Sequence, residues 1–136
     1  MKQIVIPKKL LSQIIQHARE GNPYEVCGLL GGCDDEVLEV YPIKNTEAST
    51  VSYFMDPKEQ LRAMKAMREK SQKMVGIYHS HPVAGAYPSQ KDVSLAFYDD
   101  VAYVIVSLMH EPPQVRAFEI KEGKVKEIPI VVTETE

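Results

Sequence analysis

Residues 74–92 read MVGIYHSHPVAGAYPSQKD, and this stretch decides the fold that the sequence predicts. Its apolar beginning has the composition of a buried strand. Side chains alternate between the faces of a strand, so the imidazoles of His79 and His81 would project to the same side and Ser80 would point away. Pro82 then ends the strand pairing. Two neighbouring imidazoles are a ready pair of nitrogen ligands for zinc.

Asp92 is the candidate third ligand. Ten residues separate it from His81, and it falls in the first turn of a helix predicted over residues 89–98. A loop of this size can fold the helix back over the end of the strand, and a catalytic zinc takes three protein ligands and one water. Ser89 and Asp92 also fit a capping box, in which two side chains close the first turn of a helix. The two roles compete for the Asp92 carboxylate, and we expect the metal role to dominate.

Glu25 is the candidate general base. A zinc hydrolase needs a group that takes a proton from the metal-bound water. Glu25 opens the apolar run 26–32, which predicts a buried strand. A carboxylate that enters a buried strand is costly unless it has a partner. The alternative is an ordinary exposed glutamate in a loop.

The rest of the chain predicts helices alternating with strands. Helices are expected over residues 7–20 and from Asp56 onward, with Asp56 as the N-cap. The apolar positions of the second helix are Leu61, Met64 and Met67. The predicted strands are 26–32, 36–43, 51–55, 74–78 and 101–108, followed by a hairpin of 114–120 and 124–132. This order predicts one domain over residues 1–136, with a mixed α/β or α+β sheet.

The second helix also carries a run of basic side chains. They are Lys58, Arg62, Lys65, Arg68, Lys70 and Lys73. We interpret them as a solvated face, and the alternative is docking of an acidic partner or of phosphates.

Composition excludes several classes of protein. The chain is 44% hydrophobic and 26% charged, as a globular domain is and a disordered or fibrous chain is not. A formal net charge of −3 argues against nucleic acid, and no apolar run approaches the roughly 18 residues of a membrane span. The N-terminus lacks the features of a signal peptide. Cys27 and Cys33 on one strand would lie about 20 Å apart, too far for a disulfide. We therefore expect a cytoplasmic protein that binds neither nucleic acid nor membrane.

The whole set, Glu25, His79-Ser80-His81-Pro82, Ser89 and Asp92, resembles the JAMM signature of the MPN+ (JAB1/MPN/Mov34) zinc metalloprotease family. Residues 23–30, which read PYEVCGLL, resemble the compact prokaryotic branch of that family. The resemblance implies a single-domain MPN-type fold, in which helices flank a mixed central sheet similar to that of cytidine deaminases.

The resemblance also implies residue roles and a substrate. His79, His81 and Asp92 would hold Zn²⁺. Glu25 would pass a proton from the water to the leaving amine, and Ser89 would hydrogen-bond the oxyanion. Active members hydrolyse the amide bond after the C-terminal glycine of a ubiquitin-like or sulfur-carrier protein and release an amino acid or amine. We expect a Gly-Gly tail bound as an added strand in a narrow groove lined by Asn45.

Two other functions are compatible with parts of this pattern. A catalytically silent MPN-type scaffold would act by protein–protein contact, but it would not need the ligand set. A zinc deaminase would carry a Pro-Cys-x-x-Cys segment, which is absent from the sequence.

Among the other candidate residues, we expect His17 on the surface, His110 in a loop and Cys27 as a buried, inert thiol. Tyr87 either contacts substrate or is simply exposed.

Overall fold

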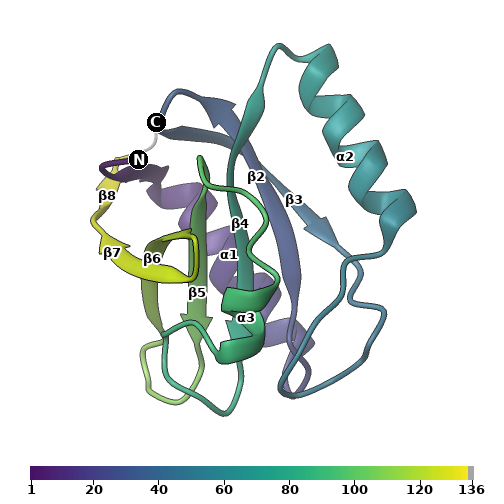
Figure 1. Cartoon of the computed structure of the whole chain (residues 1–136), viewed down its shortest axis with the longest axis vertical. Helices are drawn as coiled ribbons and strands as arrows, with labels where there is room; N and C mark the ends of the chain where they lie inside the picture. The colour runs from purple at the N-terminus through teal and green to yellow at the C-terminus, as the bar shows by residue number, and fades with distance from the viewer. Residues whose placement is uncertain (135–136) are drawn as a thin grey trace.

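A computed structural model describes residues 1–134, whose eight strands form one sheet with helices on both faces (Figure 1). The strands lie in the order β7-β6-β5-β4-β2-β3-β1-β8. β4 runs parallel to β5, and β1 runs parallel to β3 and β8, whereas the other neighbours are antiparallel. The predicted mixed sheet flanked by helices is confirmed. The elements in chain order are β1 (Ile4–Pro7), α1 (Lys8–Gly21), β2 (Cys27–Cys33), β3 (Glu36–Ile43), α2 (Pro57–Glu69), β4 (Lys73–His81), α3 (Gln90–Ser94), β5 (Ala102–Ser107), β6 (Gln114–Lys121), β7 (Lys124–Ile128) and β8 (Ile130–Thr133).

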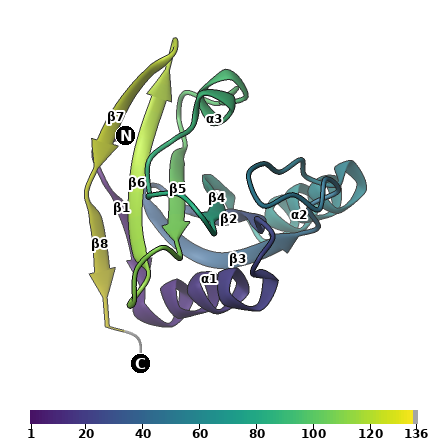
Figure 2. The same cartoon turned by 90° about the horizontal axis from the view of Figure 1, so that it is seen from below.

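Helix α1 covers one face of the sheet, as the view from below shows (Figure 2). Ile14 and Ala18 recur at helical spacing and are fully buried. They join a core to which β2 contributes Leu30 and β4 contributes Tyr78. In the part of the chain that the structure describes, no helix has both the length and the apolar character needed to cross a membrane.

Helix α2 covers the opposite face together with the segment around α3. Ala63 and Met67 are buried there and belong to the core that also contains Ile77 of β4. Leu61 shares the helical spacing of the apolar positions Met64 and Met67, but its side chain is 67% exposed. Positions two residues apart lie about 200° apart around a helix, so packing through the small Ala63 side chain turns Leu61 outward. His79 lies two residues beyond Ile77 and projects to this same face.

The strand predicted over residues 51–55 does not form. Only Met55 pairs, in an isolated bridge with Asn45. The Asn45 side chain instead takes up the backbone groups that a strand would use: its Nδ2 donates to the Ser52 carbonyl at 3.2 Å, and its Oδ1 accepts from the Phe54 amide at 3.0 Å. A loop closed by one amide side chain therefore replaces the predicted strand.

Two other elements end differently from the predictions, and one predicted N-cap lacks its side-chain hydrogen bond. The third helix stops at Ser94. Beyond it, the Tyr103 hydroxyl accepts a hydrogen bond from the Tyr98 amide at 3.1 Å and donates one to the Tyr98 carbonyl at 3.2 Å. The backbone groups of Tyr98 are therefore bonded to a side chain and not within a helix. The predicted strand 124–132 is split at Pro129, after which β8 pairs in parallel with β1, an N-terminal strand that was not predicted. Asp56 precedes α2 but makes no side-chain capping bond.

Candidate metal centre

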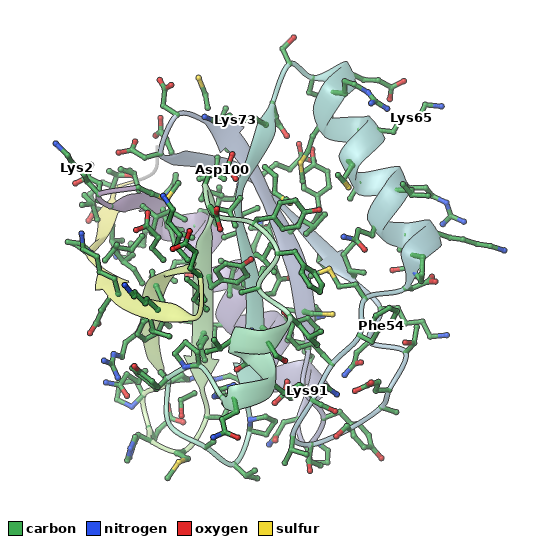
Figure 3. All side chains as sticks on the ribbon, in the orientation of Figure 1. Lys2, Phe54, Lys65, Lys73, Lys91 and Asp100 are labelled. Atoms are coloured by element: carbon green, nitrogen blue, oxygen red, sulfur yellow. The ribbon has the colours of Figure 1, made fainter. Side chains whose placement is uncertain are left out.

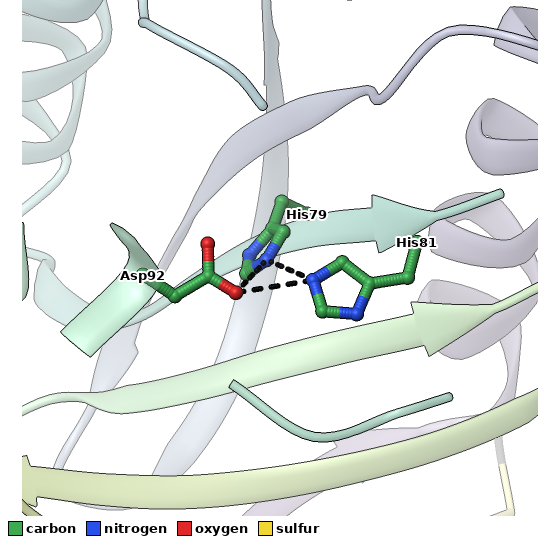
Figure 4. A group of neighbouring side chains, drawn as sticks. All are labelled: His79, His81 and Asp92. Carbon is green, nitrogen blue, oxygen red and sulfur yellow. Dashed lines mark hydrogen bonds and ion pairs between the residues drawn. The ribbon is translucent and has the colours of Figure 1, made fainter. Parts of the chain in front are cut away.

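The end of β4 and the start of α3 bring three side chains together, as the sequence predicts (Figure 4). The Nε2 atoms of His79 and His81 are 3.1 Å apart. Oδ2 of Asp92 lies 3.1 Å from each of those nitrogens. Both imidazoles are buried, while Asp92 is partly exposed at the mouth of the site.

The capping box holds Asp92 in place. The Ser89 amide donates to Oδ2 of Asp92 at 2.8 Å, and the Asp92 amide donates to Oγ of Ser89 at 3.0 Å. The same carboxylate oxygen therefore closes the first turn of α3 and faces both imidazoles. A carboxylate oxygen can accept several contacts at once, so the capping box leaves Oδ2 placed where a cation held by the two imidazoles would meet it.

Hydrogen bonding sets the protonation of the His81 ring. Its Nδ1 lies 2.8 Å from the carbonyl oxygen of Gly85. A carbonyl oxygen can only accept, so Nδ1 carries a proton, and in the neutral ring Nε2 is the nitrogen left to bind a cation. The His79 ring packs on Tyr53 with centroids 4.7 Å apart. Sequence reasoning missed this contact, because nothing in the pattern around Tyr53 indicates it.

The donor set fits a divalent cation. A tetrahedral ion with bonds of about 2.0–2.1 Å would hold its ligand atoms about 3.3 Å apart, close to the 3.1 Å spacings found here. Burial acts to raise the pKa of Asp92, but hydrogen bonds from His79 and His81 outweigh it and hold that pKa well below its usual range. Burial lowers the pKa of His79, which favours the neutral imidazole that a metal needs.

Glu25 is buried beside this cluster, with only 3% of its surface exposed, so the alternative of an exposed loop glutamate is wrong. Its backbone is anchored on both sides: its amide donates to the Ser49 carbonyl at 2.8 Å, and its carbonyl accepts from Asn45 at 3.0 Å. Its Oε1 has no hydrogen-bond partner within residues 1–134. Burial raises the pKa of Glu25 to about 7, against the opposing effect of the His81 charge. A carboxyl group tuned in this way is suited to proton transfer near neutral pH.

A cavity of about 270 Å³ opens next to Asp92. Its walls are mostly apolar and come from the loop before α2 and from the segment around α3, including Tyr53, Phe54, Leu95, Phe97 and Tyr98. Lys91 stands at its rim and forms an ion pair with Glu47 of the facing loop at 3.1 Å. Asn45, which was expected to line the groove, is not among the residues that line this cavity. Its side chain instead donates to the carbonyls of Glu25 and Ser52.

The structure also places the remaining candidate residues. Cys27 and Cys33 are free, and the Cys27 thiol donates to the Ile43 carbonyl at 3.4 Å, so the predictions of an unbridged pair and a buried thiol are confirmed. His17 is half-buried and bonded to the Tyr78 hydroxyl at 2.7 Å, so the predicted surface position is wrong. Tyr87 is exposed and makes an edge contact with Phe118, and His110 lies in an exposed loop.

Comparison with known proteins agrees with this geometry. A family model described as prokaryotic homologs of the JAB domain matches residues 7–121. The CysO-cysteine peptidase of Mycobacterium tuberculosis is 38% identical over 135 residues, which cover 96% of this chain and 92% of that relative. The desampylase of Pyrococcus furiosus is 34% identical over 130 residues, with 95% and 90% covered. A solution structure of a protein from Desulfitobacterium hafniense is 41% identical, with a TM-score of 0.89 over 97% of this chain and 94% of that one. The chain belongs to the prokaryotic JAB-domain family.

Proposed function

We propose that this chain is a single zinc-dependent peptidase domain, residues 1–136, that cleaves the amide bond after the C-terminal glycine of a ubiquitin-like or sulfur-carrier protein. The observation that carries the proposal is a buried carboxyl group, Glu25, whose Oε1 has no hydrogen-bond partner among residues 1–134, beside a convergent cluster of two imidazoles and a carboxylate. The names of the relatives, a CysO-cysteine peptidase and a desampylase, support this class of substrate. The free thiols Cys27 and Cys33 fit a reducing compartment such as the cytoplasm.

In this proposal His79, His81 and Asp92 hold Zn²⁺. Bound zinc would lower the pKa of its water to about 7 and polarise the scissile carbonyl. Nδ1 of His81 donates to Gly85, so in the neutral ring Nε2 would be the nitrogen that binds the metal. The Asp92 carboxylate is positioned by the amide of Ser89, so the capping box acts as a support for the ligand.

Glu25 moves the proton. With a pKa of about 7, its carboxylate is basic enough to accept a proton near neutral pH, and its carboxylic acid is acidic enough to return that proton to the leaving amine. Burial keeps competing water away from the unpartnered Oε1. The exposed Ser89 hydroxyl lies one helical turn from the ligand Asp92 and would donate to the oxyanion, while its oxygen accepts from the Asp92 amide. The apolar cavity beside Asp92 would take the tail of the carrier.

The test is hydrolysis of a defined conjugate. A β-grasp carrier protein ending in Gly-Gly, with cysteine joined to its terminal glycine, is incubated with zinc-loaded protein and followed by mass spectrometry. We expect loss of the cysteine mass from the wild type, and no loss from Glu25→Gln, which removes the proton-transfer group.

A matched pair of histidine variants controls for the metal. His81→Ala should lose both metal and hydrolysis, whereas His110→Ala, in an exposed loop, should keep both. Wild-type protein that binds zinc but cleaves no Gly-Gly conjugate would favour the catalytically silent scaffold. Full activity in Glu25→Gln would remove Glu25 from its proposed role.

A further inference from the structure

The outer face of α2 carries four basic side chains that pair with nothing in the described chain. Lys58, Leu61, Arg62, Lys65 and Arg68 are all exposed, and their spacing places them on one side of the helix. Within residues 1–134 none of the four cations makes an ion pair or a side-chain hydrogen bond. By contrast, Lys70 at the end of the helix pairs with Glu39 at 2.8 Å. We call these five exposed residues the α2 face.

The charge of the α2 face opposes that of the rest of the protein. Residues 57–69 contain four basic and two acidic side chains, a net charge of +2, in a chain whose net charge is −3. The remaining residues therefore carry −5. A cationic helix on an otherwise anionic molecule attracts an acidic partner to one place and repels it elsewhere.

Helix α2 and the loop that leads into it also border the cavity of the candidate site. Gln60, next to Leu61 in the sequence, lines the inner wall of the cavity that reaches Asp92. Phe54, on the loop that leads into α2, both lines that cavity and is 53% exposed. Figure 3 shows Lys65 pointing away from the sheet and Phe54 on that loop. A body seated on the α2 face could therefore direct a flexible tail past Phe54 toward Asp92.

We infer that the α2 face docks the folded body of the carrier protein, through an acidic surface with an apolar residue that covers Leu61; this inference rests on the proposed function. An exposed leucine among cations matches the apolar centre and charged rim of protein interfaces. A nucleic acid or an anionic membrane fits less well, because the remaining charge of −5 would repel an extended polyanion. If these side chains were only a solvated face, two facts would have no explanation. The cations gather on one helix of an otherwise anionic protein, and that helix borders the cavity.

The test is charge reversal of two sets of three exposed cations, one on the α2 face and one elsewhere on the surface. The triple variant Lys58→Glu, Arg62→Glu, Lys65→Glu removes the central cations of the α2 face. The control reverses three exposed lysines on the β6–β7 hairpin, Lys121→Glu, Lys124→Glu and Lys126→Glu, and so changes the net charge equally. Binding of a free acidic β-grasp carrier ending in Gly-Gly is measured by titration calorimetry, which needs no catalysis. Circular dichroism verifies that each variant is folded.

We expect the α2 variant to raise the Kd for the carrier at least about tenfold at low salt, with the difference shrinking in about 0.5 M NaCl. The hairpin control should leave Kd within about twofold of the wild type. For turnover, the ratio of KM for the carrier conjugate to KM for a short Gly-Gly-cysteine peptide should rise in the α2 variant. Leu61→Ser should weaken carrier binding in a way that salt does not change.

Two outcomes would overturn the inference, and a third would separate it from the proposed function. Equal effects of the two charge reversals would show that only net charge matters. Unchanged carrier affinity in the α2 variant, with loss of binding to a single-stranded oligonucleotide or to phosphatidylserine vesicles, would assign the face to a different partner. Carrier binding that depends on the α2 face without any cleavage would reject the proposed peptidase and keep the docking surface.

Discussion

Replacing Glu25 with glutamine should stabilise the metal-free protein above neutral pH. The Glu25 side chain is buried and its Oε1 has no partner among residues 1–134, so its ionised form is poorly solvated in the folded state. Burial raises its pKa from 4.5 to about 7. The folded protein therefore holds this proton up to about pH 7, whereas the unfolded chain releases it near 4.5. The stability that depends on the proton is complete below pH 4.5 and is lost as the pH rises to about 7.

The size of the effect follows from the pKa difference. At 1.36 kcal/mol per pKa unit, a rise from 4.5 to about 7 corresponds to about 3 kcal/mol in the free energy of unfolding. Solvent that enters the open mouth of the site screens the charge, so we expect about 2 kcal/mol. Glutamine matches the neutral acid in shape and never ionises. Glu25→Gln should thus lie within about 0.5 kcal/mol of the wild type in stability near pH 5 and exceed it by about 2 kcal/mol near pH 8.

The assay is urea unfolding of both proteins after treatment with a chelator, at about pH 5 and about pH 8. His79, His81 and Asp92 are present in both proteins, so the difference between the two curves reports Glu25 together with its charge interactions with His81 and Asp92. Parallel curves, with the same difference at both pH values, would refute the reasoning, because they would show that Glu25 is not held with a raised pKa. The zinc-loaded proteins provide a further comparison, since a bound cation favours the ionised carboxylate and should reduce the difference.

Three further predictions concern the supports of the site. Asp92→Ala should lower the zinc content from about one ion per chain to near zero by elemental analysis, and retained zinc would exclude it as a ligand. Ser89→Ala should keep the metal, lower kcat by about 10²–10³ and lower the free energy of unfolding by about 1 kcal/mol. Ser94→Ala, on the same helix, is the control. An equal kcat in the two variants would contradict the oxyanion role. A Cβ on Gly28 would lie 2.3 Å from the Tyr78 ring, so Gly28→Ala should cost about 1–3 kcal/mol in thermal unfolding, and an unchanged Tm would disprove that close contact.

The parts of the site that follow local backbone geometry were predictable. Strand alternation places His79 and His81 on one face, and the spacing from Ser89 to Asp92 is that of a capping box, which forms. The same reasoning failed for residues 51–55. Their composition suits a strand, but the Asn45 side chain binds their backbone from six or more residues away, and no local pattern shows that competition.

The chain order of the sheet was also beyond local reasoning. β8 continues the sequence of β7 but pairs with β1, so its partner lies at the other end of the chain. Pro129 interrupts the predicted strand, and its carbonyl accepts from the Ile4 amide at 3.0 Å. Leu61 is a similar case, because only the packing of Ala63 against the sheet decided which side of α2 faces solvent.

The sequence by itself predicted that His79, His81 and Asp92 come together, and on which strand end and helix start, because these depend on periodicity and on spacing over fewer than 20 residues. Only the tertiary structure decided that Glu25 is buried with a raised pKa and that the cations of α2 are unpaired beside the cavity. Desolvation and charge depend on every group packed around a side chain, whatever its distance along the chain. For that reason the raised pKa of Glu25 could be found only from the folded structure. The proximity of His79 and His81 follows from strand alternation, which the sequence shows.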